Sequence, residues 1–315
     1  MKKTCPITHQ VFEAAEGQRY SREGLRTLSP RLKGLARLPY TESEQLQEVV
    51  SRAGKMSVQG VQPKLSAVLN VKEEVFELVD RFGRFILKPP TEAYPHLPEN
   101  EALTMHLART AGIDVPDHGL IQGKDGSWTY FIRRFDRSGR KGKMAVEDFA
   151  QLTGQDRNTK YDASMEKVAG AVDRFTTFPM VENLDLFRRT IFFFLTGGED
   201  MHLKNFSLIT IKDRIRLTPA YDFLNSTIAI RNPVEEFALP LNGKKRNLTR
   251  RDLVEYFGQE RLGLPEGVIR EVLRSLEDAM QNWPAIIARS FLPQEQKDRY
   301  QALVQGRWER LRVFV

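Results

Sequence analysis

Three polar side chains in the second half of the sequence have the types and the spacing that phosphoryl transfer requires. Asp200 is followed five positions later by Asn205 and seventeen positions after that by Asp222. An aspartate can orient an attacking hydroxyl group and accept its proton, while an asparagine and a second aspartate hold the magnesium ions that bridge the phosphates of ATP. The three residues therefore predict a catalytic base at Asp200 and metal ligands at Asn205 and Asp222.

The spacing of Asp200 and Asn205 equals that in the protein kinase catalytic loop, H-R-D-x-x-x-x-N. The match is incomplete, because no His-Arg pair precedes Asp200 and Leu224 stands where the glycine of a D-F-G motif would stand. Aspartate and asparagine are also common in loops, so an ordinary loop is the alternative interpretation. The surrounding sequence favours catalysis, because it supplies the elements that a catalytic loop needs on either side.

Those elements can be read from the hydrophobic pattern. Residues 184–195 form a strongly apolar stretch of helical length, and Gly197 and Gly198 predict the end of that helix. Asp200 therefore follows a buried helix closely, in a loop held by a rigid element. Two short strands are expected within residues 206–217. Helix, catalytic loop, hairpin and metal-binding aspartate is the order found in the large lobe of kinases.

Upstream features supply the groups that would hold the nucleotide. The segment from Ser57 to Lys64 precedes an apolar strand and stands where a loop covering the phosphates is expected, although Gly60 is its single glycine and an ordinary hairpin turn is the alternative. Lys88 ends a strand, as the lysine that binds the α- and β-phosphates does in kinases. Glu101 lies in the helix that follows, where it either pairs with Lys88 or complements the helix dipole.

Several segments, in this order along the chain, resemble the signature segments of HipA-type toxin kinases. They read SVQGVQPKLS, RFILKPP, ENEALTMHLARTAGIDVP, FIRRFDR, EDFAQLTG, KYDAS, FRRTIFFFLTGGEDMHLKNFSLI and LTPAYDFLN. The resemblance covers most of the chain and implies a bacterial serine/threonine kinase with a two-lobed, protein-kinase-like α+β fold. It further implies ATP and Mg²⁺ as cofactors, an aminoacyl-tRNA synthetase as the substrate, arrest of translation, and a helix-turn-helix, HipB-like antitoxin as the partner that contacts DNA.

The resemblance also assigns roles to individual residues. By it, Asp200 is the catalytic base, Asn205 and Asp222 bind the metal, Lys88 binds phosphate, and Ser57 is the site of autophosphorylation. Further residues are expected to bind the nucleotide, namely Gly60, Val61, Gln62, Lys64, Glu101, Arg133, Phe135, Gln151, His202, Lys204 and Tyr221.

The short N-terminal part is similar to that of the compact HipT branch of this family. There the N-terminal subdomain of longer members is a separate small protein, which implies a HipS-like partner and tryptophanyl-tRNA synthetase as the substrate. Gln59 stands where some HipT sequences carry a second serine, so Ser57 is the one serine of the loop. Arg133 occupies a hinge position that is often acidic in the family, and backbone rather than side-chain contacts to adenine are therefore expected there. For His202 we favour a structural hydrogen bond over direct proton transfer.

Length and composition agree with a cytoplasmic enzyme. The chain has 315 residues, 41% hydrophobic and 28% charged, and can bury a large core. We expect a small lobe over residues 1–135, with a short N-terminal segment, the Gly-loop and the phosphate-binding lysine, and a helical large lobe over residues 136–315. Cys5 is the single cysteine, which excludes an intramolecular disulfide and fits a reducing cytosol. No apolar run approaches the roughly 20 residues of a membrane span.

The net charge of +7 permits an acidic partner but does not require one. The densest basic cluster, residues 244–251, is either a solvated loop with a helix start or a patch that touches tRNA or antitoxin-bound DNA. Thr249 and Asp252 resemble a capping box and support the helix start.

Two other functions stay open at this point. One is a small-molecule or lipid-like kinase, because the pattern D-x-H-x-x-N with a later aspartate also occurs in such branches. The other is a non-catalytic repressor subunit. Against it stand Lys88, Asp200, Asn205 and Asp222, since a binding module does not need all four.

Overall fold

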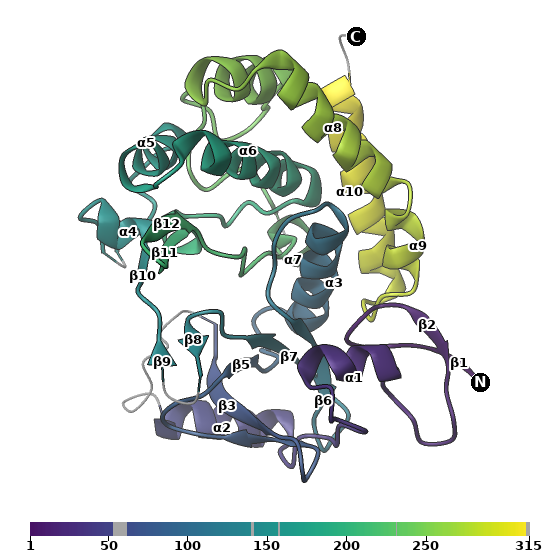
Figure 1. Ribbon diagram of the computed structural model, residues 1–315. Coiled ribbons are helices and arrows are strands. Elements are labelled where there is room, and N and C mark those ends of the chain that lie inside the picture. Colours follow the sequence, from purple (N-terminus) through teal and green to yellow (C-terminus); the bar gives the residue numbers. More distant parts are fainter. Residues whose placement is uncertain (53–61, 140–141, 157, 231, 313–315) are drawn as a thin grey trace.

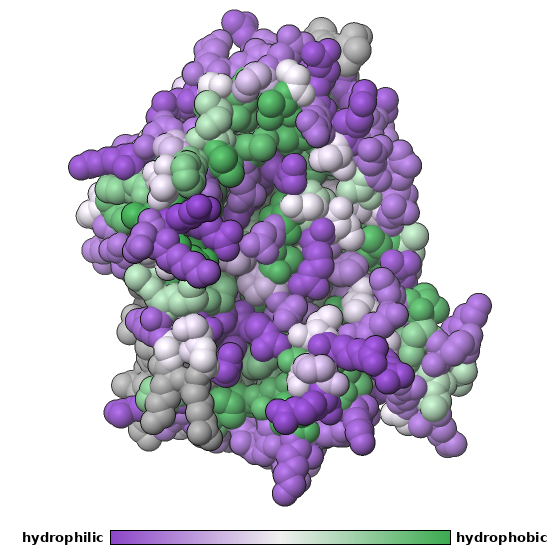
Figure 2. Space-filling model, in the orientation of Figure 1, coloured by the Kyte–Doolittle hydropathy of each residue, from purple (hydrophilic) through white to green (hydrophobic). Residues whose placement is uncertain are grey.

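The structure is a computed structural model that describes residues 1–52, 62–139, 142–156, 158–230 and 232–312. It has the two-lobed α+β fold that the sequence predicts. Figure 1 shows the strand-rich part at the bottom and the mainly helical part at the top. Hydrophilic residues cover most of the face shown in Figure 2, and hydrophobic residues reach it in separate patches.

The strand-rich part is built on one antiparallel sheet. Its strands are β3 (Leu65–Asn70), β4 (Val75–Leu78), β5 (Phe85–Lys88), β6 (His118–Gln122) and β7 (Trp128–Arg133). They pair in the order β4-β3-β5-β7-β6. The strands that the sequence predicts around residues 65–88 and 128–134 are all present, because apolar and β-branched or aromatic residues alternate there and turns rich in glycine and polar residues separate them.

The two faces of this sheet meet different partners. Successive side chains of a strand point to opposite faces, so Phe85 and Leu87 lie in the core shared with the N-terminal segment. Ile86 packs against the larger core on the other side, and Lys88 contacts helix α3 (Leu97–Thr110). This alternation is what aims Lys88 away from the N-terminal segment.

The N-terminal segment covers the outer face of the sheet. It contains β1 (Lys2–Thr4), β2 (Val11–Glu13), α1 (Arg22–Leu28) and α2 (Glu42–Arg52). Its buried leucines are Leu25, Leu28, Leu32, Leu35 and Leu38. They pack with Leu65, Phe76 and Phe131 of the sheet, so the segment completes a core that the sheet could not close alone.

The second part of the chain is mainly helical. Its helices are α4 (Phe149–Leu152), α5 (Met165–Phe175), α6 (Pro179–Thr196), α7 (Ser226–Ala229), α8 (Glu266–Met280), α9 (Trp283–Ala288) and α10 (Gln294–Arg312), with a further helical segment at Arg251–Arg261. Its strands are the short pair β8 (Arg137–Ser138) and β9 (Gly142–Lys143), and the sheet of β10 (Val146–Asp148), β11 (Ser207–Ile211) and β12 (Arg214–Leu217). Within the described ranges, none of the helices combines the length and apolar composition needed to cross a bilayer.

Helix α6 is the central element of this part and positions the loop that follows it. Its phenylalanines are buried in the large core, and it ends at Gly197, as the sequence predicts. Gly197 has a φ of 75°, and a Cβ atom there would lie 2.5 Å from Oδ1 of Asn225 and 2.6 Å from a methyl carbon of Leu303. Glycine is thus required both by the left-handed backbone and by the close packing.

The basic cluster at residues 244–251 is a folded loop that leads into a helix. Lys244 lies 2.8 Å from the carboxylate of Asp252, and Lys245 lies 3.3 Å from that of Glu235. The backbone N–H and the hydroxyl of Thr249 donate to Oδ2 of Asp252 over 3.0 and 2.8 Å, which confirms the predicted cap. The loop and the helix start that the first interpretation expects are thus both observed.

Candidate active site

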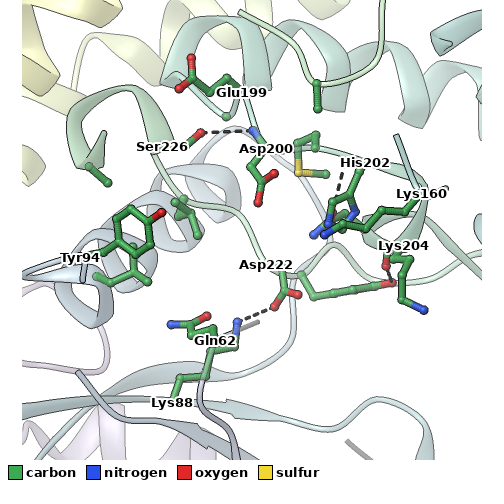
Figure 3. Close-up of a pocket in the computed structure, with 18 of the residues that line it drawn as sticks. Gln62, Lys88, Tyr94, Lys160, Glu199, Asp200, His202, Lys204, Asp222 and Ser226 are labelled. Atoms are coloured by element: carbon green, nitrogen blue, oxygen red, sulfur yellow. Dashed lines mark hydrogen bonds and ion pairs between the residues drawn. The ribbon is translucent and has the colours of Figure 1, made fainter. Parts of the chain in front are cut away.

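A cleft of about 1220 Å³ is lined by both parts of the molecule. Lys88 contributes from the end of β5, and Asp200, Asn205 and Asp222 contribute from the segments that follow α6 and β12. Figure 3 shows the side chains of Asp200 and Asp222 pointing into the same space. The fold thus brings together four residues that the sequence selected from regions more than a hundred positions apart.

Lys88 connects the two parts of the molecule. Its Nζ atom lies 2.6 Å from Oε1 of Glu101 on α3 and also contacts Oδ1 of Asp222. Lys88 and Glu101 are both fully buried. Of the two interpretations of Glu101, the pair with Lys88 is the one observed. Glu101 does not line the cleft, so it can influence a nucleotide only through that lysine.

Charge strengthens this arrangement. Burial lowers the pKa of Lys88, but the carboxylates of Asp222 and Glu101 outweigh burial and raise it. Burial raises the pKa of Asp222, but Lys64, at 3.7 Å, and Lys88 hold it well below its usual range. Asp222 is therefore a carboxylate at neutral pH. It also has a φ of 58°, an uncommon backbone conformation of the kind that clusters at functional sites.

Asp200 is held at its backbone by a helix that follows later in the chain. Its N–H donates to the hydroxyl of Ser226 over 3.2 Å, and that hydroxyl donates to the carbonyl of Gly197 over 3.1 Å. Its carboxylate accepts a hydrogen bond of 2.7 Å from the hydroxyl of Tyr161. The side chain remains exposed to the cleft, where an incoming hydroxyl group could reach it.

The turn Leu203–Asn205 closes the loop after Asp200. The N–H of His202 donates to Oδ1 of Asn205 over 3.3 Å, and the N–H of Asn205 donates back to the carbonyl of His202 over 2.9 Å. Burial and the nearby Lys160 lower the pKa of His202 to about 4, so the imidazole is neutral at pH 7. Both hydrogen bonds use the backbone of His202, and Nδ1 of its imidazole is buried without a hydrogen-bond partner among the described residues, so the side-chain hydrogen bond expected of His202 is not observed.

Of the residues expected to bind the nucleotide, Glu101 does not line the cleft, and the others fall into two groups. Those that line the cleft are Gln62, Lys64, Arg133, Phe135, Gln151, His202, Lys204 and Tyr221. Gly60 and Val61, together with the expected autophosphorylation site Ser57, lie outside the described residues. Phe135 and Tyr221 face one another with ring centroids 5.6 Å apart and form an aromatic wall. The Nε2 atom of Gln62 is buried without a hydrogen-bond partner in the described part of the chain. A buried donor normally has an acceptor, and a bound ligand could provide one here.

Arg133 differs from the other members of this set. Its guanidinium group donates to Asp117 over 2.9 Å and to the carbonyl of Leu28, at the end of α1, over 2.7 Å. It also lies over the ring of Phe85. The side chain is thus used inside the strand-rich part and is not free to contact a nucleotide.

Sequence reasoning gave no role to four residues that the structure places in the cleft, namely Asp148, Tyr161, Glu199 and Ser226. Asp148 caps α4 and holds the side chains of Lys204 and Gln151 at 3.0 Å. Burial raises the pKa of Glu199 to about 7. Asp148, Tyr161 and Glu199 lie within segments that carry the family resemblance, but those segments do not show which side chains meet, because the contacts follow from packing between separate segments.

The donor set in the cleft fits magnesium. Asp222 offers a carboxylate and Asn205 an amide oxygen, both hard ligands. Within the described residues no group of three His, Cys, Asp or Glu side chains is placed to hold a metal alone. Mg²⁺ usually binds through one or two carboxylates together with water and substrate phosphates, so a sparse oxygen set in a cleft fits this ion.

Comparison with known proteins gives consistent matches. Residues 56–283 match the model of the family described as the HipA-like C-terminal domain. A Haemophilus influenzae protein named "Putative kinase" is 31% identical, covering 91% of this chain and 90% of its own length. The serine/threonine-protein kinase toxin HipA of Shewanella oneidensis is 29% identical over 54% of this chain and 43% of its own length.

Two solved structures share the fold. A chain in the Shewanella oneidensis MR-1 complex of HipA, HipB and operator DNA aligns with a TM-score of 0.65 and 20% identity, covering 94% of this chain and 79% of that one. The proinflammatory kinase CtkA of Helicobacter pylori aligns with a TM-score of 0.58 and 16% identity, covering 82% and 91%. At these levels of sequence identity the two structures support a shared fold and no more.

Proposed function

Because the chain belongs to the family of the HipA-like C-terminal domain, we propose that it is an ATP-dependent kinase that phosphorylates serine or threonine side chains of a protein. The observation that carries this proposal is the position of Lys88, which contacts Glu101 of α3 and Asp222 in the cleft that also contains Asp200. A lysine paired with a helix glutamate beside a metal-binding aspartate is the arrangement that kinase catalysis requires.

Each group of the cleft then has a chemical task. Asp200 accepts the proton of the acceptor's hydroxyl group. The oxygen of that hydroxyl group bonds to the γ-phosphorus of ATP, while the bond from the γ-phosphorus to the oxygen that bridges it to the β-phosphorus breaks and ADP leaves. Lys88 and Lys64 bind phosphate oxygens. Asn205 and Asp222 would hold Mg²⁺, which would neutralise charge at the phosphates when bound.

The nucleotide base would occupy the side of the cleft near Phe135 and Tyr221. Their rings supply apolar surface, and the backbone near Arg133 supplies hydrogen-bonding groups. Gln62, Gln151, His202 and Lys204 border the same space. In this proposal the small lobe covers residues 1–135 and the large lobe residues 136–315.

We further propose that the kinase acts in the cytoplasm as the toxin of a toxin–antitoxin system. Support comes from the relative named as a HipA toxin and from the HipA–HipB–operator complex, whose fold is shared. A helix-turn-helix, HipB-like antitoxin would then bind this chain and contact DNA in its place. From the sequence resemblance to the HipT branch, we propose a small HipS-like protein as second partner and an aminoacyl-tRNA synthetase, the tryptophanyl enzyme first, as the substrate whose phosphorylation arrests translation.

Regulation by autophosphorylation at Ser57 belongs to the same proposal and rests on the sequence alone. A phosphate there adds about −1.5 to −2 charges at pH 7 to the loop that is expected to cover the ATP phosphates. Ser57→Ala should therefore abolish self-labelling and leave the enzyme active for longer. Undiminished self-labelling of this variant would assign the modification to another residue.

The decisive experiment combines labelled ATP with purified synthetases. The wild-type chain should place phosphate on a serine or threonine of tryptophanyl-tRNA synthetase. Asp200→Asn should lower this transfer by roughly 10²–10⁴-fold, the usual contribution of a general base, while ATP still binds. Asp222→Ala should weaken Mg-ATP binding, and Asp278→Asn, an exposed position on α8, should match the wild type.

Other outcomes separate the alternatives. Label on glutamyl-tRNA synthetase with the tryptophanyl enzyme untouched would reject the branch assignment. Label on metabolites or lipids alone would favour a small-molecule kinase. Near-wild-type transfer by Asp200→Asn would contradict the catalytic assignment of the loop.

A further inference from the structure

Tyr161 lies at the mouth of the cleft, outside the motif that contains Asp200. Its hydroxyl donates a hydrogen bond of 2.7 Å to Oδ1 of Asp200. Within the part of the chain that the structure describes, no other side chain hydrogen-bonds this carboxylate, and Oδ2 has no protein partner. Burial and the Asp200 carboxylate raise the pKa of Tyr161, so the hydroxyl keeps its proton and acts as a donor at neutral pH.

Tyr161 is itself fixed to the catalytic loop. Its ring stands edge-on to that of His202, with centroids 5.1 Å apart and an interplanar angle of 76°. The ammonium group of Lys160 lies 4.7 Å from the centre of the tyrosine ring, and the carbonyl of Lys160 accepts the N–H of Leu203 over 3.3 Å. Figure 3 shows Lys160 beside His202, across from Asp200. The tyrosine is therefore joined to the loop through its ring and through the backbone of its neighbour.

These contacts leave the Asp200 carboxylate with two unequal oxygens. The backbone of Asp200 is held by Ser226, but the last torsion of an aspartate is broad and would otherwise let the carboxylate rotate. The hydroxyl of Tyr161 occupies one oxygen and thereby sets the direction of the other. Catalytic groups lose much of their effect when their orientation is lost, even by small displacements.

We infer that Tyr161 is a positioning residue for phosphoryl transfer, whose hydroxyl fixes Oδ1 of Asp200 so that Oδ2 faces the hydroxyl group of the phosphoacceptor. The inference rests on the proposed function, since it assigns Asp200 the part of the base. It adds a residue from a segment 39 positions before the catalytic loop, and it attributes to that residue orientation of the base and no contact with ATP.

The variant Tyr161→Phe tests this, because it keeps the ring against His202 and removes the hydroxyl. Transfer of labelled phosphate from ATP is measured with two acceptors, the chain itself and the proteins of a heat-treated bacterial extract. We expect the rate at saturating ATP to fall about 10- to 100-fold, the value of one hydrogen bond to a charged group. The KM for ATP should stay unchanged.

Tyr256→Phe is the matched control. The hydroxyl of Tyr256 also donates to a carboxylate, that of Glu166, over 3.2 Å, but neither residue lines the cleft. This variant loses the same kind of bond and should transfer phosphate at the wild-type rate. A similar loss in both variants would mean that Tyr161 stabilises the fold and would overturn the inference.

The rate of phosphoryl transfer in a double variant gives a second test, which distinguishes a positioning role of Tyr161 from a purely structural one. If Tyr161 acts through Asp200, Tyr161→Phe should cost nothing further in an Asp200→Asn background, followed over hours-long time courses. An additional loss there, or phosphate found on Tyr161 itself, would contradict the inference. An active wild type with an equally active Tyr161→Phe variant would refute the inference alone, whereas an inactive wild type would refute the proposed function and the inference with it.

Discussion

At the scale of single residues, the role of Lys88 follows from the alternation of side chains between the two faces of strand β5. Its neighbour Leu87 points into the core shared with the N-terminal segment, and Lys88 points toward α3 and the cleft. A buried ammonium group is costly unless it is paired. Here Glu101 and Asp222 both pair with it, so the position is stable and still presents a cation to the cleft.

Lys88→Met should destabilise the protein by about 3–5 kcal/mol, because it leaves the fully buried carboxyl of Glu101 without its cation. Adding Glu101→Leu should recover much of this loss, since the unpaired group is then removed as well. Urea unfolding at pH 7.5 measures both variants. The matched control is Lys72→Met, at an exposed pair with Glu73 at 3.7 Å, which should change stability by less than about 0.5 kcal/mol. A Lys88→Met variant as stable as this control would show that the buried pair is not a coupled unit.

At the scale of elements, the N-terminal segment is joined to the sheet by close backbone packing against β6. The N–H of Leu120 donates to the carbonyl of Pro6 over 3.0 Å. A Cβ atom at Gly119 would lie 3.0 Å from the carbonyl oxygen of Pro6, from Cα of Ile7 and from the ring of Phe131. Two of these neighbours are backbone atoms, which cannot yield as a flexible side chain does.

Gly119→Ala should therefore destabilise the protein by about 1–3 kcal/mol through overpacking. Gly306→Ala is the control, because Gly306 lies exposed within α10 and a Cβ atom there would have no neighbour within 4 Å among the described residues; it should stabilise by about 1 kcal/mol through helix propensity. Thermal unfolding of the two variants should shift the Tm in opposite directions. Equal shifts would mean that the N-terminal segment is not packed against β6 in solution.

At the scale of the whole molecule, three buried histidines from the N-terminal segment, α3 and β6 lie together, and one of them contacts Phe291 of the helical part. The ring of His9 is stacked on that of His106 in α3, with centroids 4.9 Å apart, and meets Phe291 edge-on at 5.7 Å. His118 of β6 lies near them, and its Nδ1 is 2.8 Å from the carbonyl of Pro116. Both ring nitrogens of His9 are buried without a partner in the described residues.

This cluster predicts acid sensitivity. Burial lowers the pKa of His9 well below its usual value, that of His106 to about 4 and that of His118 to about 3, and the guanidinium groups of Arg109 and Arg289 add to the effect. The folded chain keeps these rings neutral, while the unfolded chain takes up protons below about pH 6.5. Stability from the cluster is thus complete above pH 6.5 and is lost as the pH falls toward 4 and 3.

The variant His9→Phe should lower the part of this pH dependence that His9 causes, because phenylalanine fills the same stacked position and takes up no proton. Urea unfolding at pH 7.5 and pH 5.0 measures the difference between the two free energies of unfolding, which should be smaller in the variant. An unchanged difference would show that His9 is not neutral and buried in the folded protein.

The sequence by itself determined the local elements and the residue types of the site. Periodicity placed the strands around Lys88 and the helix before Asp200, glycine at Gly197 ended that helix, and the spacing of Asn205 and Asp222 indicated phosphoryl transfer. These features are encoded within a few residues of one another, through side-chain alternation, backbone conformation and capping, so a single sequence is enough to read them.

The tertiary structure decided which side chains meet. It chose the ion pair over the helix dipole for Glu101, turned the guanidinium of Arg133 toward Asp117, and set the hydroxyl of Tyr161 against Asp200. It also folded the N-terminal segment over the sheet, for which the sequence offered no motif. Such contacts join residues far apart along the chain, and their geometry depends on how whole elements pack, which no local pattern of residue types specifies.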